Sequence, residues 1–396
     1  MINQVWNYVQ VHRKLAIWTD VKQREGTVIT THADVVGSLL RPPGLLKARK
    51  DLAGGTINDA GFKAIEDRAV DEAIRLQEEA GLEVLTDGEM RRLSFQSQFT
   101  EAVDGLGKHD IDAFLWGNWH GDERVGDLYV DRPASLGAIS KLTRKRHLSS
   151  EEFTYLRGHT TRTPKITLPS PSLWANFWSA EHSIKAYPTL DRFLGDVVAI
   201  LREEVTELVR LGASYIQIDA PHYTALLDPV TRDFYEEQGW TLDEWLSRGI
   251  EMDNALMQGF SDVTFGFHLC RGNQGSRWLV EGGYELISKQ IFQKIHARRL
   301  LLEYDDERSG SFAPLSDVPD DKMVVLGLVT TKSPRHETLQ ELTDRIKEAS
   351  RFVALERLAL SPQCGFSTSV VGNRISVEDE IRKLRLVVET AKAVWG

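Results

Sequence analysis

The feature of this sequence that most constrains its fold is a set of eight short apolar runs. They occupy residues 33–40, 82–89, 164–171, 214–221, 263–270, 299–306, 323–332 and 358–366. Near-continuous apolar runs are typical of parallel strands that are buried on both faces. Most runs are separated by enough residues for a helix, as at 337–355. Eight strands that alternate with helices predict an α/β fold, the (β/α)8 TIM barrel.

Two stretches show the helix–glycine–strand order of such a barrel especially clearly. Apolar residues recur at helical spacing at Ile65, Ala69, Ala73, Leu76 and Ala80, and again at Val198, Leu201, Val205 and Leu208. Gly81 and Gly212 follow where a helix C-cap belongs, and an apolar run comes next in both cases. This order predicts two αβ units.

Polar side chains gather at the carboxyl ends of the predicted strands. They are Ser38, Glu89, Ser170, Asp219, His268, Cys270, Glu303, Lys332 and Cys364. A TIM barrel builds its active site at that face, so we expect one there. A doubly wound sheet is disfavoured, because no glycine-rich dinucleotide loop follows the first predicted strand.

Two regions fall outside the eight units. Residues 1–30 read as an N-terminal extension, with one possible helix from Trp6 to Trp18, and residues 31–396 as a single barrel. Residues 104–162, between the second and third predicted strands, are too long for a simple connection, and we interpret them as an insertion over the barrel mouth. Trp116 and Trp119 of this insertion could cover a substrate or simply pack a small hairpin.

The charge and composition of the chain exclude several partners. Its 396 residues include 58 acidic and 48 basic side chains, a formal net charge of −10, which disfavours nucleic acid. No stretch approaches the roughly 18 apolar residues that span a membrane, and the first residues do not resemble a signal peptide. We therefore expect a cytoplasmic protein that acts on small molecules. The Trp-rich segments permit a homo-oligomer without requiring one.

The chain has two cysteines, too few for a disulfide framework. His268 and Cys270 are two residues apart on one predicted strand, so their side chains point to the same side. Glu303 and Cys364 end two further strands, and in a closed barrel all four side chains can converge at the mouth. Thiolates with imidazole select zinc, so these four residues predict a Zn2+ site. The alternative is that both cysteines are buried core residues.

Six segments together resemble a known family. They are DVVGSLLRP, TDGEM, IQIDAP, HLCRGN, LLEYDDERSG and SPQCGF, in this order. The chain from about residue 30 to 395 resembles the catalytic C-terminal barrel of cobalamin-independent methionine synthase and its single-barrel relatives, which include epoxyalkane:coenzyme M transferase. The resemblance implies that zinc binds His268, Cys270, Glu303 and Cys364. Glu303 is then the ligand that yields its place to a substrate thiol.

The resemblance also implies a homocysteine pocket. Gly37 and Ser38 match the segment that holds the amino-acid carboxylate, and Glu89 and Asp219 match the carboxylates that hold its ammonium. Buried carboxylates suit an ammonium, and backbone N–H groups at a glycine turn suit an anion. The alternatives are an ordinary turn glycine at residue 37 and a helix N-cap at Asp219.

Two segments depart from the family pattern. Lys332-Ser333-Pro334-Arg335 stands where methionine synthases of this type have His-Ser-Pro-Arg, and Asp219-Ala220-Pro221 stands in place of Asp-Glu-Pro. A proposed general acid is therefore missing, although Lys332 could replace it. A tetrahydrofolate nitrogen must be protonated as it leaves, so the departure puts methyltetrahydrofolate as donor in doubt.

The function that follows is zinc-dependent alkyl transfer to a thiol, most simply methyl transfer to homocysteine giving methionine. The catalytic candidates are Glu89, Asp219 and Lys332. One rival is alkyl transfer to coenzyme M, whose sulfonate would need Arg91, Arg92 or Arg271. A second is a non-catalytic zinc protein or corrinoid-protein partner. A metal-free decarboxylase of the uroporphyrinogen decarboxylase type is less favoured, because it has no use for the four ligands.

Overall fold

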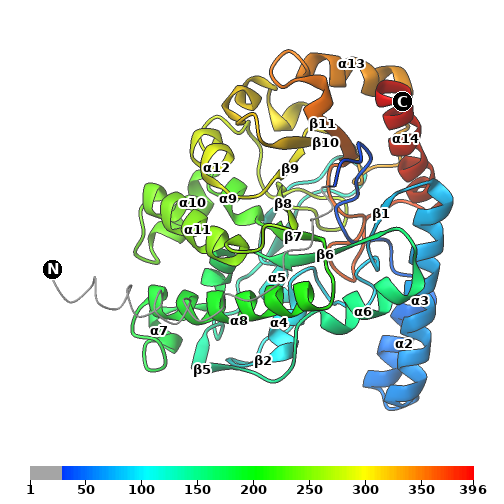
Figure 1. The fold of residues 1–396 in the computed structure, drawn as a ribbon. Helices are drawn as coiled ribbons and strands as arrows, with labels where there is room; N and C mark the ends of the chain where they lie inside the picture. The colour runs from blue at the N-terminus through cyan, green and yellow to red at the C-terminus, as the bar shows by residue number, and fades with distance from the viewer. Residues whose placement is uncertain (1–28) are drawn as a thin grey trace.

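The computed structural model describes residues 29–396, so the helix expected between Trp6 and Trp18 lies outside the described part. Seven parallel strands form one curled sheet with the order β1-β6-β7-β8-β9-β10-β11 (Figure 1). These strands are β1 (Val84–Leu85), β6 (Thr163–Pro169), β7 (Tyr215–Asp219), β8 (Thr264–Leu269), β9 (Arg299–Glu303), β10 (Met323–Val329) and β11 (Leu358–Pro362). Six of them lie within a predicted apolar run, and β6 begins one residue before its run. The architecture is an α/β fold consistent with a TIM-like barrel.

The first apolar run differs from the prediction of a regular strand. Its regular pairing is limited to one parallel bridge between Ala33 and Leu360 of β11. At its other end, Leu39 N–H donates to the Gly88 carbonyl at 3.0 Å, just beyond β1. Residues 33–39 thus connect the two edges of the sheet through a few bonds, and this irregular segment takes the place of the eighth strand.

Helices surround the curled sheet (Figure 1). The longer ones are α2 (Pro43–Ala53), α3 (Asp59–Ala80), α6 (Ser150–His159), α8 (Leu190–Arg210), α10 (Pro229–Glu236), α11 (Leu242–Met257), α12 (Ser288–Lys294), α13 (Leu339–Ala349) and α14 (Val377–Trp395). Short ones are α4 (Ser97–Ala102), α5 (Asp112–Leu115), α7 (Ala180–Ser183), α9 (Pro221–Ala225), η1 (Pro171–Phe177), η2 (Glu307–Ser309), η3 (Ala313–Asp317) and η4 (Leu355–Arg357). The predicted helix before Gly81 is confirmed as α3, and Gly81 caps it with φ 91°. The second predicted helix is α8.

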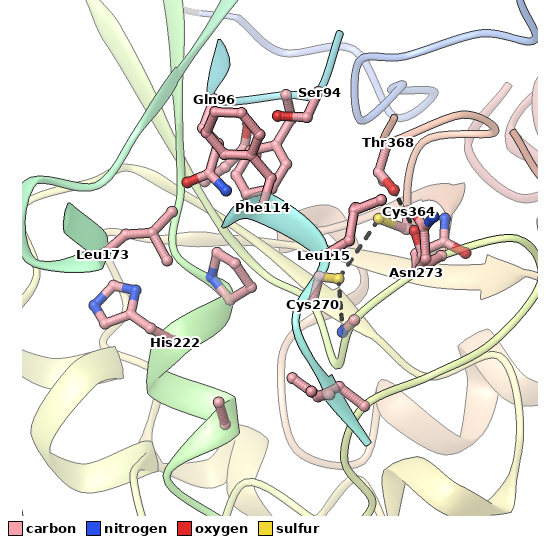
Figure 2. A pocket seen from close by; sticks show the side chains of 18 of the residues that line it. Ser94, Gln96, Phe114, Leu115, Leu173, His222, Cys270, Asn273, Cys364 and Thr368 are labelled. Atoms are coloured by element: carbon pink, nitrogen blue, oxygen red, sulfur yellow. Dashed lines mark hydrogen bonds between the residues drawn. The ribbon is translucent and has the colours of Figure 1, made fainter. Parts of the chain in front are cut away.

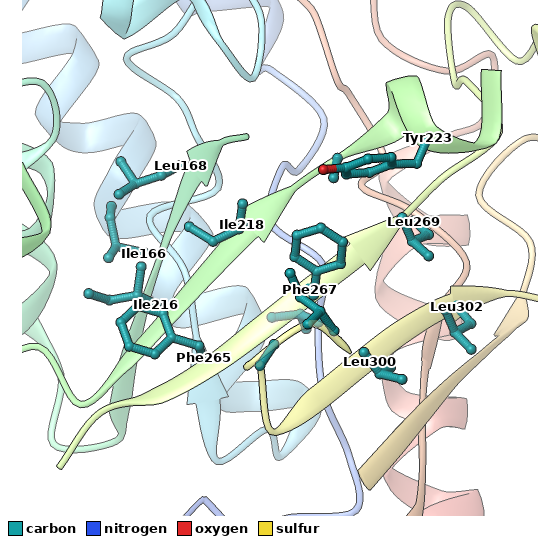
Figure 3. Packing of buried hydrophobic residues seen from close by; sticks show 14 of the residues in the cluster. Ile166, Leu168, Ile216, Ile218, Tyr223, Phe265, Phe267, Leu269, Leu300 and Leu302 are labelled. Carbon is teal, nitrogen blue, oxygen red and sulfur yellow. The ribbon is translucent and has the colours of Figure 1, made fainter. Parts of the chain in front are cut away.

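The strands alternate between an apolar outer face and a more polar inner face. Outward side chains on β6 to β9 pack in the large core, as Figure 3 shows for Ile166, Leu168, Ile216, Ile218, Phe265, Phe267, Leu300 and Leu302. The residues between them point inward, and Leu301 accordingly belongs to a separate small cluster with Val36, Val325 and Ala359. The inner face therefore has room for polar side chains.

A buried ionic cluster fills the amino-terminal end of the inner face. Asp34 pairs with Lys165 at 3.0 Å and with Arg299 at 3.1 Å, and it accepts a hydrogen bond from the Tyr215 hydroxyl at 2.6 Å. Buried charges are tolerated when they are paired and hydrogen-bonded in this way. This end of the sheet is therefore filled by protein side chains, whereas the carboxyl end carries the cavity described below.

The long segment between β1 and β6 carries its own small elements. Strands β2 (Val103–Leu106) and β5 (Ala138–Arg144) pair antiparallel, as do β3 (Gly117–Trp119) and β4 (Leu128–Val130). Trp119 lies in the β3–β4 hairpin and donates from its indole nitrogen to the Leu115 carbonyl at 2.7 Å. Across residues 29–396, no helix combines the length and apolar character needed to cross a membrane.

Candidate metal centre and active site

A cavity of about 1150 Å³, its open mouth included, lies at the carboxyl ends of the strands (Figure 2). Predicted site residues that line it are Ser38, Glu89, Asp219, His268, Cys270, Arg271 and Cys364. They come from loops and strand ends that are far apart in sequence. Residues 113–117 and Trp119 of the segment between β1 and β6 line the same cavity. The expected gathering of polar side chains at this face is thus found.

Three predicted metal ligands form a compact buried cluster. One ligand atom from each of His268, Cys270 and Cys364 lies within 4.8 Å of the others, and the two sulfurs are 3.6 Å apart. The His268 Nδ1 atom lies 3.2 Å from the Leu301 carbonyl, so Nδ1 carries the proton and donates. Nε2 is buried and has no hydrogen-bond partner in the described chain. An unpaired imidazole lone pair beside two sulfurs fits a divalent cation that binds nitrogen and sulfur.

The surroundings of the sulfurs favour one thiolate even without a metal. The backbone N–H of Gly272 donates to the Cys270 sulfur at 3.1 Å. The hydrogen bond from the Cys364 thiol lowers the pKa of Cys270 to about 5. The same contact raises the pKa of Cys364, because a second thiolate so close would repel the first. A cation between the sulfurs would allow both to be thiolates.

Glu303, the fourth predicted ligand, is held by other partners. Its Oε1 accepts from the Lys332 ammonium at 2.9 Å, and its Oε2 accepts from the Arg271 backbone N–H at 2.8 Å. Burial alone would raise the pKa of Glu303, but the charges of Lys332 and Arg271 outweigh burial and lower it. The described structure therefore gathers three of the four predicted ligands and keeps the Glu303 carboxylate in an ion pair.

Lys332 is buried in this ion pair. Burial opposes its charged form, yet the attraction of Glu303 prevails and raises the pKa of the ammonium. A lysine with a raised pKa that already donates to a carboxylate is a poor proton donor at neutral pH. The predicted role of Lys332 as a substitute general acid is therefore not supported by its contacts, and the side chain positions Glu303 instead.

The buried carboxylate of Glu89 lies beside Arg92, whose guanidinium is 3.5 Å from Oε1, and it keeps one oxygen unpaired among the described residues. Its Oε1 accepts from the Thr167 hydroxyl at 2.8 Å, whereas its buried Oε2 has no partner within residues 29–396. The backbone of Glu89 has φ 55°, a conformation that is uncommon outside glycine and often found at functional sites. A Cβ atom at Gly37 would lie 2.7 Å from Oε1. Glycine at residue 37 therefore leaves the space that the carboxylate occupies.

Asp219 and Ser38 line the same cavity. Burial raises the pKa of Asp219 to about 7, although the nearby His268 acts in the opposite direction. Its Oδ1 accepts from the Gln217 amide at 2.7 Å. The Ser38 hydroxyl accepts from Ser367 N–H at 3.3 Å. These contacts anchor both residues. The N-cap residue of α9 is Ala220, so the alternative of a helix N-cap at Asp219 is not found.

The arginines that were expected to bind an anion are engaged elsewhere. Arg91 does not line the cavity, because its guanidinium pairs with Glu66 at 2.7 Å and Asp67 at 2.6 Å, both on α3. Arg92 is buried and pairs with Glu152 at 2.7 Å. Arg271 lines the cavity, but its guanidinium donates to Tyr284 and to the backbone carbonyls of residues 282, 303 and 309.

Several lining residues were not singled out from the sequence. They include Ser94, Gln96, His222, Asn273 and Thr368 (Figure 2). His222 and Asn273 each stand three residues beyond a predicted site residue, so their position just past a strand end was an available signal. The Asn273 amide donates to the Gly365 carbonyl at 2.6 Å and thereby joins the loops that carry the two cysteines.

Residues 28–393 match the catalytic domain of cobalamin-independent synthase, and the matched range contains every residue of the metal cluster and the cavity. The chain belongs to this family. The likeness inferred from the six sequence segments is thereby confirmed.

Relatives of the cobalamin-independent synthase family match nearly the whole chain. The protein YxjG of Bacillus subtilis is 33% identical, over 92% of this chain and 94% of its own length. A methionine synthase of Pyrococcus abyssi is 27% identical, over 89% of this chain and 90% of its own. The crystal structure of the putative vitamin-B12-independent methionine synthase from Listeria monocytogenes matches with a TM-score of 0.70. Its sequence is 27% identical, and the match covers 93% of this chain and 99% of that one.

Proposed function

We propose that this protein is a zinc-dependent methyltransferase that moves a methyl group to the thiol of homocysteine and gives methionine. The observation that carries the proposal is the cluster of two sulfurs and an unpaired imidazole nitrogen at the base of a cavity. Membership of the synthase family supports it, as does the name of the Pyrococcus relative, methionine synthase. The closed inner face below the cluster keeps the reacting atoms at the carboxyl mouth of the barrel.

In this proposal His268, Cys270 and Cys364 hold the zinc ion. When bound, zinc lowers the pKa of a substrate thiol, so that the sulfur is a thiolate at neutral pH. Lys332 keeps the Glu303 carboxylate in an ion pair and so leaves room beside the three ligands for the sulfur of the substrate. Glu303, the exchangeable fourth ligand implied by the family resemblance, stays in this ion pair, and Lys332 is a positioning residue.

The amino-acid head of homocysteine would bind in the same cavity beside the metal cluster, since Asp219 of β7 is the in-register neighbour of His268 of β8. The free Oε2 of Glu89 and the carboxylate of Asp219 are the acceptors for its ammonium, because both line the cavity and are buried. The Gly37–Ser38 segment is the site for its carboxylate. This arrangement fixes the direction of the thiol and excludes water from it.

The two rivals are disfavoured by specific contacts. A coenzyme M sulfonate needs a free cation, and the three candidate arginines all have other partners. A zinc protein without a substrate of its own has no use for a buried, unpaired Glu89 oxygen. An amino-acid thiol satisfies that oxygen.

Zinc X-ray absorption of the purified, zinc-loaded chain tests the proposal. We expect two sulfur neighbours without substrate and three after homocysteine is added. The control thiol is 4-mercaptobutyrate, which lacks the ammonium and should bind more weakly. Glu89→Gln with Asp219→Asn should remove this preference. Spectra that homocysteine leaves unchanged would overturn the proposal.

A further inference from the structure

Among the described residues that line the cavity, the roles assigned by the proposed function leave no side chain free to protonate a leaving group. Lys332 is committed to Glu303, and both Glu89 and Asp219 are required as carboxylates if they hold the ammonium of the acceptor. His222 lines the cavity, but its Nε2 lies 2.7 Å from the Ser172 hydroxyl, and burial keeps its imidazole neutral by lowering its pKa to about 3. A donor that needs proton transfer on departure therefore fits this site poorly.

The walls of the cavity suit a cation. Aromatic rings line it at Phe95, Phe114, Trp116, Trp119 and Tyr235, and Figure 2 shows Phe114 on the wall of the pocket that also holds Cys270. Aromatic faces and carboxylates attract a desolvated cation.

The charges of the residues that line the cavity also favour a cation over an anion. Among the described lining residues, the one permanent positive charge is that of Arg271, and its guanidinium already has four acceptors. Two acidic side chains, Glu89 and Asp219, line the cavity, and Oε1 of Glu89 lies 3.5 Å from the buried Arg92 guanidinium, which is outside the lining. An anionic donor, such as one with a chain of carboxylates, would enter this cavity against repulsion.

We propose that the methyl donor is an onium cation, a sulfonium or a quaternary ammonium compound. This inference rests on the proposed function, because it needs a thiolate acceptor. The acceptor sulfur uses a lone pair to form the new S–CH3 bond, and the bond from methyl carbon to the positive sulfur or nitrogen breaks. Its electron pair stays on the leaving atom, which departs as a neutral thioether or amine. No proton is needed, and the opposite charges of thiolate and donor cancel.

Binding of matched probes tests the cation site without turnover. Choline and 3,3-dimethylbutan-1-ol have nearly the same shape, but only choline is charged. In calorimetric titrations of the zinc-loaded chain we expect choline to bind at least tenfold more tightly. Phe114→Leu and Trp116→Leu should reduce that preference, whereas Phe352→Leu, at an exposed ring outside the cavity, should not. Equal affinity for both probes would overturn the inference.

Turnover of a donor panel distinguishes the sources. Zinc-loaded chain with homocysteine is given methyl-deuterated dimethylsulfonioacetate, trimethylglycine or 5-methyltetrahydrofolate, and labelled methionine is measured by mass spectrometry. Product from the sulfonium or the ammonium donor, at least 100-fold above the reaction without protein, supports the inference and identifies the class. Product from the folate alone overturns it.

The zinc absorption spectrum separates this inference from the proposed function. A third sulfur neighbour with homocysteine, together with no transfer from either onium donor, refutes the donor class and leaves the thiol site intact. If homocysteine adds no sulfur neighbour, the proposed function fails and the donor class fails with it.

Discussion

Replacement of Lys332 by methionine tests the ion pair beside the metal cluster. Methionine fills a similar volume, but it removes the ammonium that lies 2.9 Å from Glu303 Oε1. Both side chains are almost fully buried, and loss of one partner of a buried pair costs about 3 to 5 kcal/mol. Glu303 keeps the hydrogen bond from Arg271 N–H, so we expect the lower value, about 3 kcal/mol, in the free energy of unfolding of metal-free protein.

Urea unfolding followed by tryptophan fluorescence measures this effect. The control is a double-mutant cycle with Glu303→Gln, because the double variant Lys332→Met with Glu303→Gln contains neither charge and should regain most of the lost stability. In zinc-loaded Lys332→Met, the freed carboxylate should appear as an oxygen neighbour in the zinc absorption spectrum. A cost below about 1 kcal/mol, with no coupling between the two substitutions, would refute the role of Lys332 as the partner of Glu303.

Three further predictions concern the metal, the acceptor and the pH dependence of stability. Cys364→Ser should lower zinc affinity by at least about 100-fold in competition with a chelator, and unchanged affinity would place the metal elsewhere. Gly37→Ala should displace the Glu89 carboxylate and raise the homocysteine KM about tenfold, the loss of one charged hydrogen bond, while Gly44→Ala, with open space around its Cβ, should leave it unchanged. Burial raises the pKa of Glu380 from 4.5 to about 8. The unfolded chain thus releases this proton first, and wild-type stability falls as pH rises from about 4.5 to about 8, by an amount on the order of 5 kcal/mol. Glu380→Gln should remove this fall in stability. In urea unfolding, the free energy of unfolding of the variant should therefore exceed that of wild type by more at pH 8.5 than at pH 5. An equal difference at both pH values would contradict the raised pKa of Glu380.

The parallel strands could be predicted because their signal is local. Six of the seven lie inside an apolar run, and β6 begins one residue before its run. The helix α3 ends at its predicted cap Gly81, whereas α8 is capped by Leu211, one residue before the predicted Gly212. The segment at 33–39 was harder, because its hydrogen bonds depend on Leu360 and Gly88, which are distant in sequence. β1 spans only Val84 and Leu85 before the chain turns to present Glu89. This turn places Glu89 at the cavity, and its residues show no periodic apolar pattern that could be recognised in the sequence.

The metal cluster was predictable for a similar reason, since His268 and Cys270 share one side of a strand. The state of Glu303 was not, because sequence placed Lys332 and Glu303 at the same mouth without showing that they pair. For Arg91, a position close to a site residue in the sequence did not predict a position in the cavity. It stands two residues from Glu89, yet the acidic side chains of α3 draw it away from the cavity.

The irregular segment that joins β11 to the end of β1 has a consequence for ligand binding. Residues 33–39 cross this seam with few backbone bonds, and the same stretch carries Gly37 and Ser38, while Glu89 follows on the far side. The barrel is thus held by few backbone hydrogen bonds at the place where homocysteine is proposed to bind. Homocysteine would link the two sides of this seam, because its carboxylate is proposed to bind at Gly37–Ser38 and its ammonium at Glu89. Amide hydrogen exchange at the seam should therefore slow when homocysteine binds.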